Sequence, residues 1–179
     1  MRVAVLIGLI GLLVAPTSAV TVVPLSFPQL VTAATAVVHG RVTEVRGQWT
    51  ADRRGIESLV TIDALRYLKG DLGGRVTVRV PGGEAGGLIN VIPGVPRLVQ
   101  GDHVVIFLTT SGPSVPVVTG TTQGVFRVGV DPRSGGLIVQ PPAALGAAPG
   151  VVRRGDLTRR PLTMAGFADA VRQAQQVAR

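Results

Sequence analysis

Short runs of β-branched and aliphatic residues, separated by turns rich in glycine and proline, dominate the middle of the sequence. The chain contains 24 glycines and 13 prolines in 179 residues. Apolar runs of this length that are bounded by Gly or Pro are typical of strands and too short for most helices. We predict strands over Ala36–Val45, Leu59–Leu68, Arg75–Val80, His103–Leu108, Val115–Val118, Val125–Val130 and Leu137–Val139.

A helix is expected at each end of this β-rich region. Ser26 can cap a short helix over residues 26–36. Thr163 can cap a C-terminal amphipathic helix with one apolar stripe, formed by Met164, Phe167, Val171, Ala174 and Ala178. Gly40 lies inside the first strand, where it predicts a bulge or a sharp bend. Together these signals predict a mainly β fold, a small closed β-barrel with a short N-terminal helix and a C-terminal amphipathic helix.

The first 19 residues have the organisation of a secretory signal peptide. Met1-Arg2 supplies a positive charge, Val3–Val14 is an unbroken apolar and glycine run, and small residues stand at Thr17 and Ala19. The run is short for a membrane span, which needs about 20 residues. We expect cleavage after Ala19 and a secreted or periplasmic chain with no stable membrane span; an uncleaved anchor is the alternative.

The remaining chain divides by composition. Residues 20–140 form the expected β-barrel domain, residues 141–161 a linker rich in Pro, Ala, Gly and Arg, and residues 162–179 the C-terminal helix. No cysteine is present, which excludes disulfides, thiolate zinc sites and thiol nucleophiles.

The chain is basic, with a formal net charge of +8. Lys69 is its one lysine, and four of the arginines cluster at Arg153, Arg154, Arg159 and Arg160. Proteins that bind single-stranded nucleic acid interleave such charges with aromatic stacking platforms. Aromatic residues make up 3% of this chain, so we expect no nucleic-acid partner.

Between Ala36 and Val130 the order of motifs resembles a group of exported bacterial proteins of unknown function. The motifs are Val38-x-Gly40-x-Val42, Leu68-Lys69-Gly70-Asp71, Val80-Pro81-Gly82-Gly83, Gly94-Val95-Pro96, Gly101-Asp102, Phe107-Leu108 and Gln123-Gly124-Val125-Phe126. This group is similar in outline to the OB-type barrel of the tissue inhibitors of metalloproteinases and related netrin-like domains. The resemblance implies an OB-like barrel.

The expected mature N-terminus adds to this resemblance. The inhibitors begin Cys-Thr-Cys-Val-Pro, and cleavage after Ala19 would leave Val20-Thr21-Val22-Val23-Pro24. In that family the first residue chelates the protease zinc through its main chain, and the second side chain enters the specificity pocket. The resemblance implies that Val20 and Thr21 act in this way on an exported metalloprotease.

The residues that could carry catalysis lack the partners that catalysis needs. His39 is expected to be a strand residue with a satisfied hydrogen bond, and His103 a half-exposed residue at the start of a strand. The glycine-rich segment 81–87 lacks the lysine and hydroxyl of a phosphate-binding loop, and we expect a loop with positive φ angles. The spacing of Glu84 and Asp102 in the sequence does not support a carboxylate pair for acid–base catalysis. We therefore predict no catalytic residue, metal or cofactor.

These observations favour a non-enzymatic binding module that contacts a protein partner through two loops, Gly47–Gly55 and Pro81–Gly101. The candidate partner-binding residues within them are Trp49, Arg53, Arg54, Glu84 and Arg97. The alternatives are an inhibitor that acts through Val20 and Thr21, and a hydrolase with an unrecognised site.

Overall fold

The computed structural model describes residues 24–112, 114–142 and 160–177. The expected signal peptide, Val20, Thr21 and most of the expected linker lie outside these residues. In chain order the elements are α1 (Phe27–Ala33), β1 (Ala36–Trp49), β2 (Ile56–Lys69), β3 (Arg75–Pro81), β4 (Gly83–Ala85), β5 (Leu88–Asn90), β6 (His103–Thr109), β7 (Val117–Val118), the 3-10 turn η1 (Thr121–Gly124), β8 (Val125–Val130), β9 (Leu137–Gln140), β10 (Leu162–Thr163) and α2 (Met164–Val177).

The prediction of a mainly β fold is confirmed. Within the described residues, eight strands form one sheet in the order β1-β2-β3-β7-β6-β8-β9-β10, and β4 and β5 form a separate two-stranded ribbon. β1 also pairs with β6, so the neighbours lead from β1 through β2, β3, β7 and β6 back to β1. The β3–β7 step is a single parallel pair, Arg79 with Val117.

Strand β1 is irregular at Gly40, where the sequence predicted a bulge or a bend, and at two further places on either side of it. Its register against β2 shifts between His39 and Gly40. A Cβ atom on Gly40 would lie 2.5 Å from the backbone oxygen of Asp63 and 2.7 Å from a methyl carbon of Ile62. Only glycine allows this close approach. Strand β1 pairs with β2 along one edge and with β6 along the other.

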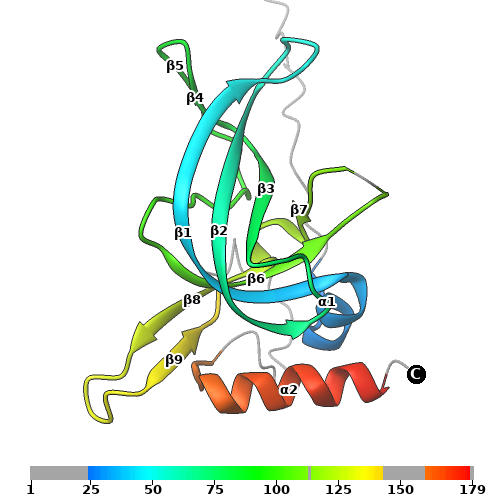
Figure 1. The fold of residues 1–179 in the computed structure, drawn as a ribbon, viewed down its shortest axis with the longest axis vertical. Coiled ribbons are helices and arrows are strands. Elements are labelled where there is room, and N and C mark those ends of the chain that lie inside the picture. Colours follow the sequence, from blue (N-terminus) through cyan, green and yellow to red (C-terminus); the bar gives the residue numbers. More distant parts are fainter. Residues whose placement is uncertain (1–23, 113, 143–159, 178–179) are drawn as a thin grey trace, which may run out of the picture.

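Two apolar cores lie on opposite faces of the sheet. One contains residues with side chains between the curved strands, among them Val38, Ile62, Val78 and Ile106. The other lies beneath the two helices and joins the chain's four phenylalanines, Phe27, Phe107, Phe126 and Phe167, in edge and tilted contacts with centroids 5.0–6.3 Å apart. Helix α2 therefore shares a core with α1 and the sheet, and both helices lie at the same end of the molecule (Figure 1).

Four sequence-based expectations need correction. Helix α1 ends at Ala33 rather than residue 36, because the chain turns extended at Ala34 and Thr35 N–H donates to the Leu108 carbonyl. Residues 47–49 belong to β1, where they pair with residues 56–58 of β2, so the β1–β2 loop is shorter than expected. Segment 81–101 is not wholly irregular, since it contains β4 and β5. Residues 162–163 pair with β9 as a strand before α2 begins.

Lys69 closes the C-terminal end of α1. Its ammonium Nζ donates to the carbonyl oxygens of Val31 at 2.7 Å, Ala34 at 2.6 Å and Thr32 at 3.4 Å. These carbonyls have no partner within the helix, and a cation is favoured at this end of the helix dipole. A compact ammonium can converge on three oxygens, whereas a planar guanidinium spreads its donors. This contact gives a physical role to the one lysine in an arginine-rich chain.

We predict that Lys69→Met lowers the free energy of unfolding by about 1–3 kcal/mol, because partly buried carbonyls lose their donor. Lys69→Arg should be more stable than Lys69→Met but less stable than the wild type, although the charge is kept. Equilibrium denaturation in urea measures both. Arg172→Met, on the exposed face of α2, is the control and should change stability by less than about 0.5 kcal/mol. Full stability in Lys69→Met would show that the cap is dispensable.

Candidate functional site

The candidate site is the end of the molecule that carries the β4–β5 ribbon. The ribbon is an antiparallel hairpin in which Ala85 pairs with Leu88, and Gly86-Gly87 forms its two-residue turn. Both glycines have positive φ, at 59° and 76°. This is the conformation that two-residue hairpins require and that glycine adopts without strain. The expectation of positive φ angles in segment 81–87 is confirmed at these positions.

Close contacts fix the ribbon against the main sheet. A Cβ atom on Gly47 of β1 would lie 1.8 Å from the Glu84 carbonyl oxygen, so the ribbon rests directly on the β1 backbone. The Ser58 hydroxyl donates to the Gly82 carbonyl at 2.8 Å, and Gly82 N–H donates to the Ile56 carbonyl at 2.8 Å. The ribbon is thus held at its base by both β1 and β2.

Large apolar side chains are exposed on this ribbon and next to it. Relative exposures are 42% for Trp49, 56% for Leu88, 71% for Ile89 and 81% for Val91. The Trp49 indole Nε1 lies 3.5 Å from where a Cβ on Gly86 would be, so the tryptophan borders the ribbon's turn. We call Trp49, Leu88, Ile89 and Val91 the apolar tip. Single exposed apolar residues are normal on protein surfaces, whereas several large ones at one end of a molecule make that end a candidate interaction site.

The other predicted site residues divide into those near the tip and those away from it. Arg53 and Arg54 lie in the β1–β2 turn, which reaches the same end of the molecule as the ribbon (Figure 1). Asp52 shapes that turn by accepting bonds from the Thr50 hydroxyl and from Arg54 N–H, and these bonds lower its carboxyl pKa. Glu84 is exposed on the ribbon itself.

Arg97 belongs to a different part of the fold. Its carbonyl accepts a bond from the Arg127 guanidinium of β8 at 2.7 Å, and the next residue, Leu98, is buried in the core between the curved strands. Asp102 accepts from Val99 N–H at 2.8 Å and forms an ion pair with Arg127. Asp102 is thus occupied by structural bonds and does not pair with Glu84.

The structure brings the two histidines together. The Nε2 atoms of His39 and His103 are 2.6 Å apart, so the partner of the predicted hydrogen bond of His39 is the other histidine. Burial lowers the pKa of His39 to about 4, with further contributions from His103, Arg66 and Arg41. Burial and Arg41 also lower the pKa of His103. No local sequence signal could have revealed this contact, because it depends on the register of β1 against β6.

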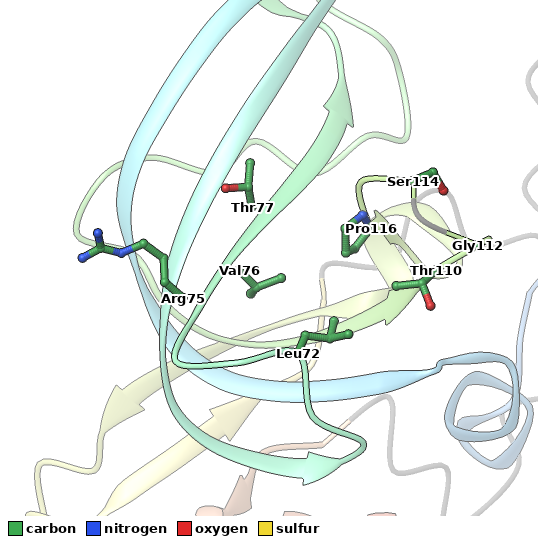
Figure 2. A pocket seen from close by; sticks show the side chains of 8 residues that line it. All are labelled: Leu72, Arg75, Val76, Thr77, Thr110, Gly112, Ser114 and Pro116. Atoms are coloured by element: carbon green, nitrogen blue, oxygen red, sulfur yellow. The ribbon is translucent and has the colours of Figure 1, made fainter.

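A shallow hollow of about 360 Å³ lies between β3 and the loop that follows β6 (Figure 2). Its lining includes Thr77, Thr110 and Ser114. Arg75 extends away from these side chains in Figure 2 and pairs with Asp63 at 2.8 Å. Arg75 is the charged residue among the described lining residues, and its guanidinium is engaged by Asp63.

Within the described ranges, no three or more His, Cys, Asp or Glu residues form a group that could hold a metal ion. No helix in that part of the chain is long and apolar enough to cross a membrane. Neither a protein-family model, a curated protein nor a solved structure matches the sequence.

The contact between Gly47 and the ribbon can be tested through Trp49, the one tryptophan of the chain. We predict that Gly47→Ala displaces the ribbon, because the new methyl would overlap the Glu84 carbonyl. Quenching of Trp49 fluorescence by iodide should increase, and stability should fall by about 1–3 kcal/mol. Gly74→Ala is the matched control, since a Cβ there meets nothing within 4 Å. Unchanged quenching in Gly47→Ala would contradict the packing described.

Proposed function

We propose that the chain is an exported binding module without enzymatic activity, and that the apolar tip docks a protein partner. The observation that carries the proposal is the exposure of Leu88 and Ile89 on an anchored ribbon, with Trp49 and Val91 exposed next to it. Export is supported by the order of charged, apolar and small residues at the start of the sequence.

The tip has the chemistry of a protein interface. Transferring a Val, Leu or Ile side chain from water to a fully buried site contributes about 1.5–3 kcal/mol. The bonds at the base of the ribbon hold these side chains in place before a partner arrives, which reduces the entropy lost on binding. Tryptophan and arginine, present here as Trp49 and Arg53, are also enriched among the residues that dominate binding energy.

The charge at this end favours a protein over an anionic membrane. Arg53 and Arg54 are balanced by Asp52 and Glu84, which makes the formal sum zero (2 − 2). Docking on anionic lipid draws on an excess of basic residues, each worth about 1 kcal/mol near the surface. A neutral, apolar end suits a partner that offers a complementary apolar surface.

An OB-type barrel is the scaffold that we propose for this tip. The neighbour order β1-β2-β3-β7-β6-β1, with β3 and β7 parallel, supports it, as does the motif resemblance to the netrin-like group. In such barrels the loops at one end carry the binding surface. The absence of enzymatic activity is supported by the structural bonds that occupy Asp102.

We predict that Ile89→Ser with Val91→Ser strongly reduces partner capture. The wild type, this tip variant and a control variant, Leu65→Ser with Val130→Ser, would be immobilised and exposed to the source organism's exported fraction. The control removes apolar side chains that are exposed to similar extents, 57% and 63%, away from the ribbon. All four sites are exposed, so both variants should fold.

The wild type and the control should retain the same partner protein. The tip variant should retain at least about tenfold less of it, which corresponds to about 1.4 kcal/mol of binding free energy. The purified partner should also shift Trp49 emission to shorter wavelength as the indole leaves water. A partner retained equally by the tip variant would refute docking at this end.

A further inference from the structure

We infer that His39 and His103 form a binding site for a divalent transition-metal ion, with Cu²⁺ as the preferred ion. They are the two histidines of the chain, and they stand 64 positions apart in the sequence. The fold nevertheless brings their ring nitrogens together. The site is independent of the apolar tip.

The two imidazoles meet through their nitrogen edges. The Nε2 atoms are 2.6 Å apart, whereas the ring centroids are 4.7 Å apart. Each ring therefore directs an Nε2 position toward the same small region. In a chain without cysteine, imidazoles are the donors best suited to a transition metal.

The backbone fixes this arrangement from two strands. On β1, His39 pairs with Val105 and Arg41 pairs with His103, so the histidines are diagonal neighbours on adjacent strands. His39 is 7% exposed and begins the bend at Gly40, while His103 is partly exposed at the start of β6. The buried ring supplies rigidity, and the partly exposed one leaves room for an ion and its water ligands.

A metal ion can replace the proton that the pair shares. Two neutral imidazoles in contact need one Nε2–H to form their hydrogen bond. If that proton moves to Nδ1 of the same ring, both Nε2 lone pairs are available and neither ring changes its net charge. Metal binding requires neutral imidazole, which is the prevailing form of a histidine with an ordinary pKa at pH 7.

The distances are compatible with one ion. Metal–nitrogen bonds of about 2.0–2.1 Å at a right angle place two nitrogens roughly 2.9 Å apart. The two Nε2 atoms now face each other head-on. The His103 ring would need to rotate so that its Nε2 swings aside by roughly 2 Å, after which the two nitrogens would lie at a right angle about the ion. The partly exposed position of His103 allows that rotation.

Two protein ligands favour Cu²⁺ over Zn²⁺. Structural zinc sites have four protein ligands in tetrahedral geometry, and the described residues offer no third His, Cys, Asp or Glu to such a group. Cu²⁺ has the highest affinity for nitrogen donors in the divalent series and accepts a tetragonal set completed by water.

Charged neighbours set the strength of this site. The positive charges of Arg41 on β1 and Arg66 on β2 lie close enough to His39 to lower its pKa, and Arg41 has the same effect on His103. Both arginines therefore disfavour a cation at this site. The nearby carboxylates are engaged elsewhere, Asp63 with Arg75 and Asp102 with Arg127. Removing one of these arginine charges should therefore tighten metal binding, which a purely structural histidine pair would not show.

The test uses the full chain without a polyhistidine tag, titrated with CuCl₂ at pH 7 in a non-coordinating buffer. Calorimetry should give one ion per chain, and electron paramagnetic resonance should show coupling to two imidazole nitrogens. His103→Gln should weaken Cu²⁺ binding by at least about 10–100-fold. Losses of this size occur even when only a residue that hydrogen-bonds to a metal ligand is removed. Zn²⁺ should bind more weakly than Cu²⁺.

Arg66→Gln should tighten Cu²⁺ binding by about two- to fivefold, the scale of an exposed charge interaction. The absence of one-to-one binding would overturn the inference. Binding that persists in the His39→Gln/His103→Gln double variant would also overturn it, because the ion would then lie at the chain terminus or on carboxylates. Circular dichroism of each variant confirms that the fold is kept. His103→Gln tests the site by itself if His39→Gln fails to fold.

Discussion

The arrangement of the whole molecule depends on the close approach of β1 and β2 at Gly40. Any side chain there would overlap the Asp63 carbonyl and Ile62, and the strand could not bend where it does. The bend lets one strand pair with β6 near its start and with β2 along its length. The unbroken register of β1 against β6 places His39 beside His103. Beyond Gly40, β1 continues with β2 to the end of the molecule opposite the helices (Figure 1).

The two ends of the molecule are built differently. At the helical end, four phenylalanines pack together and Lys69 caps the last turn of α1. At the ribbon end, the backbone is equally well bonded, through Ser58 and Gly82, but its large apolar side chains face water. The bonds at the base of the ribbon maintain this exposure, because a loosely held hairpin could fold its apolar residues onto the sheet. The first end provides stability, and we propose that the second provides binding.

Local patterns in the sequence predicted much of the scaffold. The strand predicted over Arg75–Val80 is present as β3, and its Val76, Val78 and Val80 are buried. The irregularity predicted at Gly40 is present as a shift in register against β2. The ribbon was missed because its strands have three residues each, within a glycine-rich segment typical of a loop. The contacts of Lys69 with α1 and of His39 with His103 join residues more than 30 positions apart. Such contacts follow from strand register and helix docking, which a single sequence does not specify.

Amide hydrogen exchange tests most directly whether the anchored, exposed ribbon is the docking surface. Exchange would be measured for the protein alone and with its purified partner. We predict that amides of residues 83–91 and of the β1–β2 turn exchange more slowly in the complex. The β8–β9 hairpin, at the other end, should be unchanged. Protection confined to β8–β9 or α2, with the ribbon amides unaffected, would contradict the account.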